Sequence, residues 1–359
     1  MSVMTVSRSL RGVGRVKDET RMRVREVAER LGGRRYDGVI MSRLLHDSAR
    51  ESRMRLVLPR IAPEEQGRDP TIDASLLRGL EQRLVERGGT LNTPCVESLD
   101  DLIDAYRKHR GHAVVLRRWL PRHWTRRLRD VAPVVYATMH DFQEGTDAVY
   151  VNEHRAATRI MEHLAELGHV DIGWVGVIDH HRPGVAPKGM IDANASHNIV
   201  DRQPDSAVRH AAWANFALCQ LAAHKLPLIM VGRDWRYQSL DDVVREAVDQ
   251  VVALRPQPTA IVCAASIIGR AMVRGLNRRG LTVPGDMSVV AYGIAEDQPD
   301  DLPTMTMIDL PMERIGRVIP ELIERRLANP DAVAVSMQLD AGFCVGETTG
   351  PTPPRSREV

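Results

Sequence analysis

Short apolar runs alternate with helix-length amphipathic segments along most of this chain. The helix-length segments are residues 71–88, 155–168, 240–254 and 267–279. The apolar runs, each the length of a buried strand, are Met54–Pro59, Ala113–Leu116, Val134–Tyr136, Ile172–Gly176, Ile229–Val231, Ala260–Cys263 and Ser288–Tyr292. Strands that alternate with helices of ten or more residues predict an α/β protein with parallel sheets of the doubly wound type. In such folds ligands bind at the carboxyl ends of the strands, and ~300 residues suffice for two domains.

The N-terminal segment has a different pattern, because two short amphipathic helices with a tight connection are predicted there. The first spans Ser2 to Leu10 and places Val6 and Leu10 on one face. The second follows a glycine-containing turn, runs from about Asp18 to Leu31 and ends at two glycines. This arrangement predicts a helix-turn-helix unit.

The charges of the chain are divided in the same way. Fifteen of the 49 Lys and Arg residues, but only seven of the 47 acidic residues, lie in residues 1–60. This front segment therefore carries +8, whereas the remaining residues carry −6. A basic module in front of an acidic body is the electrostatic pattern expected of a small DNA-contacting unit attached to a sensor domain.

The N-terminal residues resemble the headpiece of LacI/GalR-family repressors. The likeness rests on the segment from Met4 to Arg8, on Val16, on Glu19-Thr-Arg and on the run from Val27 to Gly32. In that family the stretch that matches Ser2 to Leu10 is the recognition helix, which lies in the major groove. The resemblance implies that Val3, Met4 and Arg8 contact base edges and that Thr5 and Ser7 contact the backbone. The DNA-binding candidates of this segment are Ser2, Val3, Met4, Thr5, Ser7, Arg8 and Arg11.

The headpiece also departs from the family pattern. The family has a first helix and turn ahead of the recognition helix, so we expect about a dozen residues to be absent before Met1. Lys17 replaces the family's serine N-cap, and Gly33 and Arg35 stand where a tyrosine and a proline are usual. Two interpretations follow. Either the chain belongs to a regulator whose DNA-binding module is complete in its gene, or it is a sensor-only protein that binds a small molecule but not DNA.

The segment between the headpiece and the body, Asp37 to Ser48, contains several apolar residues and precedes a charged run. In the LacI/GalR family the matching segment is a hinge helix that orders on operator DNA and inserts a leucine into the minor groove. The resemblance makes Leu44 the candidate for that leucine. The alternative is a plain linker helix that packs on the body.

The body carries the same resemblance. The matching segments are Ala157 to His169, Pro258 to Ile261, Gly280 to Val290 and Pro303 to Thr306 followed by Pro311 and Ile315-Gly316. They imply two Rossmann-like lobes similar to periplasmic binding proteins, joined by three chain crossings, with a small molecule held between them. The predicted domains are a partial, all-α helix-turn-helix headpiece (1–35), a hinge (36–52), the two-lobed effector-binding and dimerisation domain (53–349) and a disordered tail (350–359).

The identity of the effector cannot be inferred from sugar-sensing members of the family. Where those members have an Asn-Asp pair and an aspartate, this chain has Ala265-Ser266 and Gly293, and the family's arginine falls in an inserted stretch. The charged groups that bind sugar hydroxyls are thus largely lost. The candidate effector-binding residues are Arg209, Trp213, Phe216, Trp235, Ser266 and Tyr292, with the alternative that the aromatic residues belong to the core.

Signatures of other functions are absent from the sequence. There is no GxSxG elbow, P-loop or helix-opening GxGxxG, so we expect no enzyme and no cofactor. The four cysteines form no CxxC pair, His180-His181 has no suitably spaced acidic or cysteine partner, and we expect no metal site. Cys263 is expected to pack in a buried strand rather than to act as a nucleophile.

The sequence predicts a cytoplasmic protein. It has no apolar region typical of a signal peptide and no run near the ~18 apolar residues of a membrane span. Together the observations predict a ligand-responsive transcriptional regulator, acting as a repressor. It is expected to bind a near-palindromic operator as a homodimer and to respond to a small-molecule effector, a sugar or related metabolite.

Overall fold

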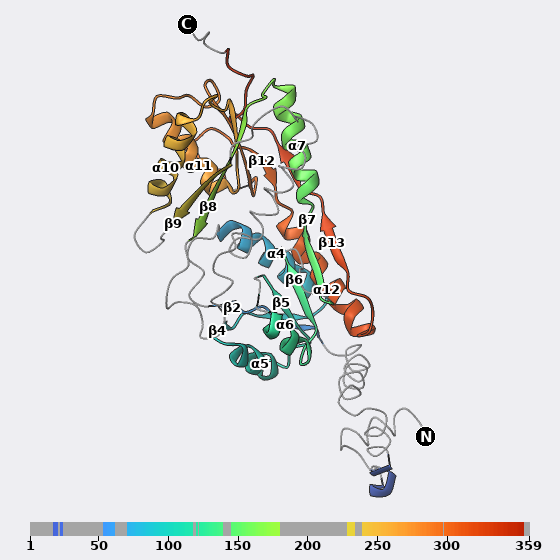
Figure 1. Cartoon of the computed structure of the whole chain (residues 1–359). Helices are drawn as coiled ribbons and strands as arrows, with labels where there is room; N and C mark the ends of the chain where they lie inside the picture. Colours follow the sequence, from blue (N-terminus) through green and yellow to red (C-terminus); the bar gives the residue numbers. More distant parts are fainter. Residues whose placement is uncertain are drawn as a thin grey trace.

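Two lobes, each built on a six-stranded sheet, make up the body of the computed structural model (Figure 1). The residues that the structure describes are 17–20, 22–23, 53–61, 70–117, 120, 122–138, 145–179, 228–233, 239–296 and 298–354. The predicted hinge, and nearly all of the predicted headpiece, lie outside these residues. We call the lobe formed mainly by residues 53–151 the lower lobe and the one formed mainly by residues 153–309 the upper lobe, after their places in Figure 1.

The lower lobe contains a fully parallel sheet with the strand order β13-β7-β6-β5-β1-β3. Its strands are β1 (Arg55–Val57), β3 (Thr90–Asn92), β5 (Ala113–Leu116), β6 (Val134–Ala137), β7 (Asp147–Val151) and β13 (Ser336–Leu339). A separate parallel pair joins β2 (Arg60–Ile61) to β4 (Cys95–Val96). The sheet is buried on both faces, as parallel sheets require.

The described helices that cover this sheet are α4 (Pro70–Glu86), α5 (Leu99–Lys108), α6 (Arg122–Arg129) and α12 (Met312–Ala328). Successive side chains of a strand point to opposite faces, which divides the core along β5. Val115 belongs to the cluster that contains residues of α4 and α12, whereas Leu116 belongs to the cluster that contains residues of α5 and α6. Helices α4 and α12 therefore cover one face, and α5 and α6 cover the other.

The upper lobe contains a sheet with the order β14-β12-β11-β10-β8-β9, in which only β14 is antiparallel to its neighbour. Its strands are β8 (Ile172–Asp179), β9 (Leu228–Arg233), β10 (Ala260–Cys263), β11 (Ser288–Gly293), β12 (Thr306–Asp309) and β14 (Gly342–Cys344). Its described helices are α7 (Glu153–Glu166), α10 (Leu240–Ala253) and α11 (Ser266–Arg278). The predicted α/β class with two parallel-sheet lobes is confirmed.

The helices of the upper lobe also divide between the two faces of its sheet. Helix α11 packs so closely on one face that a Cβ on Gly269 would lie 3.0 Å from the Cβ of Ala291. On α7, the ring of His163 contacts the ring of Phe343, with 5.1 Å between the centroids. Strand pairing places Phe343 in line with Tyr292, on the face opposite Ala291. Helices α7 and α11 therefore lie on opposite faces.

The chain passes between the lobes three times, as predicted. It leaves the lower sheet after β7, returns after β12 into α12, and leaves again between β13 and β14. The first and third crossings are bonded to each other, since the Asn152 amide donates to the carbonyl of Leu339 (2.9 Å). Arg155 adds an ion pair of 2.7 Å with Asp340. These bonds hold the first and third connections between the lobes side by side.

Helices α4 and α12 cross with their backbones in contact. A Cβ on Gly316 would lie 2.3 Å from the carbonyl oxygen of Leu76, and one on Gly79 would lie 2.0 Å from the carbonyl oxygen of Glu313. Only glycine fits at either position. Surface ion pairs flank the crossing, among them Arg83 with Glu321 (2.7 Å) and Arg317 with Glu86 (2.8 Å).

A buried carboxylate fastens the far end of α12 to the lower sheet. Asp147, at the start of β7, is fully buried and accepts bonds from Arg326 at 2.7 and 2.9 Å. The Val335 amide donates a third bond of 2.7 Å. A bidentate arginine pair with additional donors is the arrangement that compensates a buried charge.

The ordered body continues past the predicted boundary at residue 349. His169 is buried and bonds through Nε2 to the carbonyl oxygen of Gly350 and through Nδ1 to the hydroxyl of Thr259, both at 2.9 Å. The Thr352 amide donates to the carbonyl of Leu167 (2.9 Å). Residues 350–352 were predicted to belong to a disordered tail, and these bonds show that they are part of the upper lobe. Residues 355–359 lie outside the described chain.

We expect Gly316→Ala to lower the free energy of unfolding by at least about 1–3 kcal/mol. The new methyl group meets the backbone of α4, which cannot shift without moving the whole helix. Gly275→Ala in α11 is the matched control. There the methyl would meet only the Val248 side chain at 2.7 Å, and the gain in helix propensity of about 1 kcal/mol offsets part of the loss. Urea unfolding followed by tryptophan fluorescence measures both. If Gly275→Ala lowers the free energy of unfolding as much as Gly316→Ala does, the result contradicts the close backbone contact at the α4–α12 crossing.

We also expect stability to fall as the pH is lowered below 6.5. Burial lowers the pKa of His169, His163 and His112 below the ordinary value of 6.5. The unfolded chain then takes up protons before the folded protein does, so stability is kept above pH 6.5 and is lost as the pH falls toward the lowered pKa values. Each histidine contributes at most about 1.4 kcal/mol per pH unit.

His169→Gln tests the contribution of His169 to this pH dependence. The glutamine amide can replace both hydrogen bonds of the imidazole but does not titrate. Thermal unfolding between pH 8 and 5 should show a shallower decline for the variant than for the unaltered protein. Parallel curves for the two proteins would show that His169 does not contribute.

Candidate functional site

The carboxyl ends of the two parallel sheets face each other. The chain leaves the carboxyl end of β7 to enter the upper lobe, and it leaves the carboxyl end of β12 to enter the lower lobe. Because all strands but β14 are parallel within each sheet, the carboxyl ends of these parallel strands lie at the boundary between the lobes (Figure 1). This is the location at which open α/β sheets bind ligands.

On the upper side of the boundary, Ser266 begins helix α11 directly after β10. Its side chain is buried, and it lies so close to the end of β11 that a Cβ on Gly293 would be 2.8 Å from the Ser266 Oγ. Ala265 is the N-cap of α11 and supplies no side-chain bond to the first turn. The amides of this turn therefore point toward the boundary without a side-chain cap.

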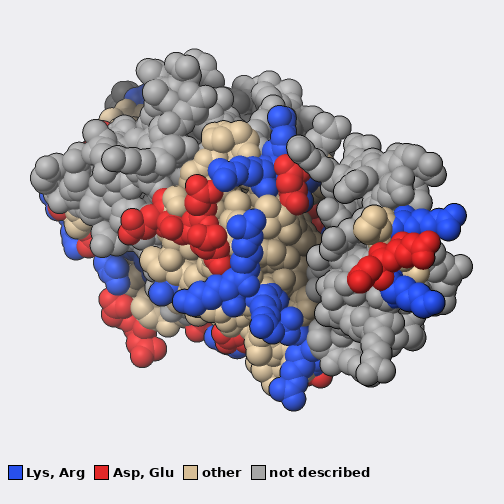
Figure 2. Space-filling model, turned by 90° about the horizontal axis from the view of Figure 1, so that it is seen from below, with Lys and Arg blue, Asp and Glu red and all other residues tan. Residues whose placement is uncertain are grey.

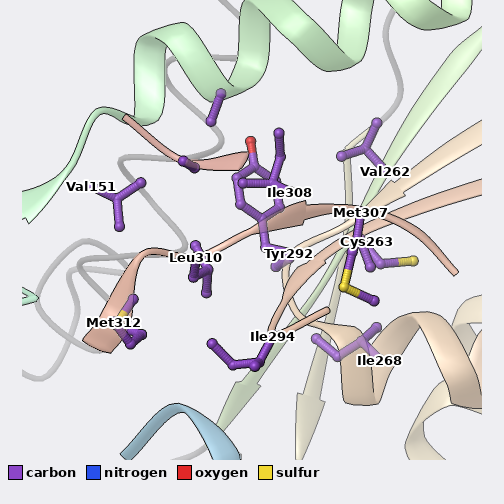
Figure 3. Close-up of a cluster of buried hydrophobic side chains, with 14 of the residues drawn as sticks. Val151, Val262, Cys263, Ile268, Tyr292, Ile294, Met307, Ile308, Leu310 and Met312 are labelled. Atoms are coloured by element: carbon purple, nitrogen blue, oxygen red, sulfur yellow. The ribbon is translucent and has the colours of Figure 1, made fainter. Parts of the chain in front are cut away.

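Tyr292 lies inside the upper lobe rather than on an open surface. Its exposed fraction is zero, and its ring packs edge to face against Trp174 with 6.1 Å between the centroids. Figure 3 shows Tyr292 beside Ile308, with its hydroxyl group directed away from Met307 and Cys263. The sequence offered pocket and core as alternatives for the aromatic candidates. The structure places Tyr292 in the core, one residue from the Gly293 that contacts Ser266.

On the lower side of the boundary, Arg117 and Asp73 form a largely buried ion pair that sequence analysis missed. Arg117 follows β5, Asp73 lies in the first turn of α4, and their side chains are 10% and 27% exposed. The Arg117 Nε is buried and makes no hydrogen bond to the described residues. The available signal was an arginine directly after the apolar run Ala113–Leu116, at the end of a strand where ligands bind.

Two further features mark the same boundary. Thr138, directly after β6, has a φ of +69°, which is strained for a β-branched residue, and such strain gathers at ligand sites. Arg78 of α4 lies 3.7 Å from Glu296 in the loop after β11 and 3.8 Å from Glu313 of α12. The first of these ion pairs joins the two lobes across the boundary.

Most predicted site residues fall outside the part of the chain that the structure describes. Ser266 and Tyr292 are the two predicted effector residues that lie within it, and the fold brings them to neighbouring strand ends. The others are the effector candidates Arg209, Trp213, Phe216 and Trp235 and the DNA-binding candidates Ser2, Val3, Met4, Thr5, Ser7, Arg8, Arg11 and Leu44. The roles of all of them stay predictions.

The described residues contain no group of three or more His, Cys, Asp or Glu side chains arranged to hold a metal ion. Burial raises the pKa of the Cys263 thiol far above its ordinary value, so this cysteine is not a thiolate nucleophile at neutral pH. Among the described helices, none has both the length and the apolar composition to cross a bilayer.

Two family profiles match the sequence. The profile described as "Bacterial regulatory proteins, lacI family" matches residues 1–33, and the profile described as "Periplasmic binding protein-like domain" matches residues 161–349, more than half of the chain. The chain belongs to the LacI family of bacterial regulatory proteins. The suspected LacI/GalR membership, and with it a helix-turn-helix domain ahead of a periplasmic-binding-protein-like body, is confirmed.

Relatives of this LacI-family chain are transcriptional repressors. The HTH-type transcriptional repressor PurR of Erwinia tasmaniensis is 23% identical over 236 residues, which are 66% of this chain and 55% of that protein. PurR of Photobacterium profundum is 33% identical over 82 residues, which are 23% of this chain and 25% of that protein. The chain thus spans about half, or less, of the length of these curated relatives. They are regulators and not enzymes.

Solved structures share the two-lobed fold. A LacI transcriptional regulator from a Rhodococcus species has a TM-score of 0.62 at 19% identity and covers 84% of this chain and 100% of that one. The lac repressor dimer bound to operator and the anti-inducer ONPF has a TM-score of 0.63 at 16% identity and covers 98% of this chain and 96% of that one. At these identities the likeness shows the fold alone.

We expect Asp73→Asn to destabilise the protein by about 1–3 kcal/mol, because it removes the counter-charge of the largely buried Arg117 guanidinium. Asp100→Asn is the matched control. Asp100 lies 2.7 Å from its partner Arg127, but the two side chains are 71% and 61% exposed. The free energy of unfolding should therefore fall by less than about 1 kcal/mol. Urea unfolding measures both variants, and equal losses would show that burial does not strengthen the Arg117–Asp73 pair.

Proposed function

We propose that this LacI-family chain is a ligand-responsive transcriptional repressor that binds a near-palindromic operator as a homodimer. The observation that carries the proposal is the combination, in one chain, of a lacI-family match at residues 1–33 with a two-lobed body whose sheets meet at their carboxyl ends. The basic front segment, with a net charge of +8 in residues 1–60, supports the DNA-binding half.

The proposed mechanism couples the boundary between the lobes to DNA. An effector that binds one relative position of the lobes better than another shifts the equilibrium between them. The lower lobe continues into the N-terminal segment at Arg53, so a change in lobe angle is transmitted to residues 36–52 and 1–35, the proposed hinge and headpiece. Ser2 to Arg11 would then read the major groove, and Leu44 would enter the minor groove.

The effector that fits the described part of the boundary is a small polar molecule. The lower edge supplies Arg117 and Asp73, and the upper edge supplies Ser266 with the first turn of α11. Guanidinium and backbone N–H groups donate to hydroxyl and carboxylate oxygens, and a carboxylate accepts from hydroxyl groups, which a sugar or related metabolite offers. Arg209, Trp213, Phe216 and Trp235 complete the set of candidate effector residues, and Tyr292 supports the end of β11 from within the core.

The DNA-binding half is tested with the full chain and the DNA upstream of its own gene. At a fixed salt concentration we expect this DNA to bind at least ~10³-fold more tightly than a scrambled duplex. Arg8→Ala should reduce that discrimination by about 1–3 kcal/mol, because an arginine paired to a guanine edge is removed. Fluorescence anisotropy measures both. Equal affinity for the two DNAs would contradict an operator-binding regulator, and ligand binding without DNA binding would indicate a sensor-only protein.

The effector half is tested by thermal shift with a panel of sugars and related metabolites. A ligand at 100 times its dissociation constant stabilises the protein by about 2.7 kcal/mol. Ser266→Ala should weaken the binding of a hit, whereas Ser239→Ala, at the exposed N-cap of α10, should not. Equal weakening by both variants would place the ligand elsewhere.

A further inference from the structure

The underside of the lower lobe carries a group of exposed basic side chains that the proposed operator contacts do not use. We define the basic rim as Arg53, Arg107, Lys108, Arg110, Arg126 and Arg129, all of which are exposed. Over residues 104–110 and 126–130, which hold five of the six, the exposed acidic residues are Asp104 and Asp130, whereas Asp100 and Asp101 lie at the opposite end of α5. Figure 2 shows the molecule from below, with Lys and Arg side chains crossing the middle of the described surface and a group of acidic side chains to one side.

Sheet topology brings the members of the basic rim together. Strands β6, β5 and β1 are neighbours in the lower sheet, and the rim residues lie at the amino ends of all three. Arg53 precedes β1, Arg110 precedes β5, and Arg129 precedes β6. The ends are bonded to one another, since His112 donates its amide to the carbonyl of Arg55 (2.7 Å) and Val114 donates its amide to the carbonyl of Pro133 (2.8 Å).

A favourable interaction with a helix dipole accounts for only some of the basic residues in the rim. Arg107, Lys108, Arg126 and Arg129 lie in the last turns of α5 and α6, where cations interact favourably with the helix dipole. Arg53 and Arg110 lie outside any helix. Within the described chain, no ion pair involves Arg53, Lys108, Arg110 or Arg126. Two exposed arginines of the upper lobe, Arg245 and Arg279, differ in this respect, since they pair with Asp242 and Asp249.

The basic rim is also the place at which the N-terminal segment joins the body. Residues 1–33 match the lacI-family profile, and Arg53 begins the described body, so nineteen residues connect the two. That connection spans about 65 Å at most when fully extended. Duplex DNA is stiff over ~150 base pairs, so DNA held by residues 1–33 has straight flanks, and a connection of this length allows them to reach the rim.

We propose that the basic rim is a second nucleic-acid contact surface, which binds the phosphate backbone of DNA flanking the operator. The proposal rests on the proposed function, because it requires that the chain bind DNA. Arginine and lysine contacts to phosphates add affinity and salt dependence but carry no sequence information. The rim would therefore strengthen binding to all duplex DNA and leave operator discrimination to the headpiece.

The test compares two full-length variants in which the same number of charges is removed. The rim variant carries Arg53→Gln, Lys108→Gln, Arg110→Gln and Arg126→Gln. The control variant carries Arg245→Gln, Arg255→Gln, Arg278→Gln and Arg279→Gln, four exposed positions of the upper lobe. Fluorescence anisotropy with a labelled duplex of scrambled sequence, between ~50 and ~200 mM KCl, gives the slope of log affinity against log salt for each protein.

We expect the slope of the rim variant to become shallower by about 0.9 for each phosphate that the protein no longer neutralises, and that of the control variant to stay at the unaltered value. The ratio of affinities for upstream and scrambled DNA should be kept in both. Equal slopes for the two variants would overturn the proposal while leaving operator binding intact. No binding of DNA by the unaltered chain would overturn the proposed function as well.

Thermal unfolding confirms that each variant is folded before it is compared. If the fourfold rim variant does not fold, Lys108→Gln with Arg126→Gln takes its place, and Arg245→Gln with Arg278→Gln becomes its control. The expected change in slope is then about 1.8, and an unchanged slope again contradicts the proposal.

Discussion

The direction of the strands at the three chain crossings is the constraint on which the rest of this structure depends. The chain leaves β7 at its carboxyl end to enter the upper lobe and leaves β12 at its carboxyl end to enter the lower lobe. Because every strand but β14 runs parallel within its sheet, the carboxyl ends of these strands, where α/β sheets bind ligands, face the other lobe. The crossing of α4 and α12 at Gly79 and Gly316 then fixes the returning helix on the lower sheet. A ligand site between lobes and a path to the N-terminal segment follow from this one arrangement.

The same directions separate two kinds of charge. At the carboxyl edge, Arg117 is largely buried and paired with Asp73, which suits a small polar ligand taken out of water. At the amino edge of the same sheet, the basic rim is exposed, which suits a long polyanion whose contacts are made in water. One parallel sheet thereby presents the proposed effector-binding edge and the proposed DNA-contacting edge at opposite ends of strands such as β5, only four residues long.

Much of the fold was predictable because parallel strands are buried on both faces and appear as continuous apolar runs. Ala113–Leu116 and Ala260–Cys263 were predicted with the bounds that β5 and β10 have. Strand β13 was not predicted, since Ser336–Leu339 is short, lies at a sheet edge and alternates between exposed and half-buried residues. The order at residues 350–352 was missed for a different reason. It depends on bonds to His169 and Leu167, which are distant in sequence and leave no local pattern.

The sequence by itself determined the family, the α/β class, the two lobes and the basic front segment, because these depend on local periodicity, motif order and charge. Only the tertiary structure decided which side chains meet. It placed Tyr292 against Trp174 in the core, brought Ser266 to Gly293, and paired Arg117 with Asp73. It also gathered Arg53, Lys108, Arg110 and Arg126 on one edge. Such pairings join residues far apart in the chain, and they are set by strand order and helix packing, which no single stretch of sequence encodes.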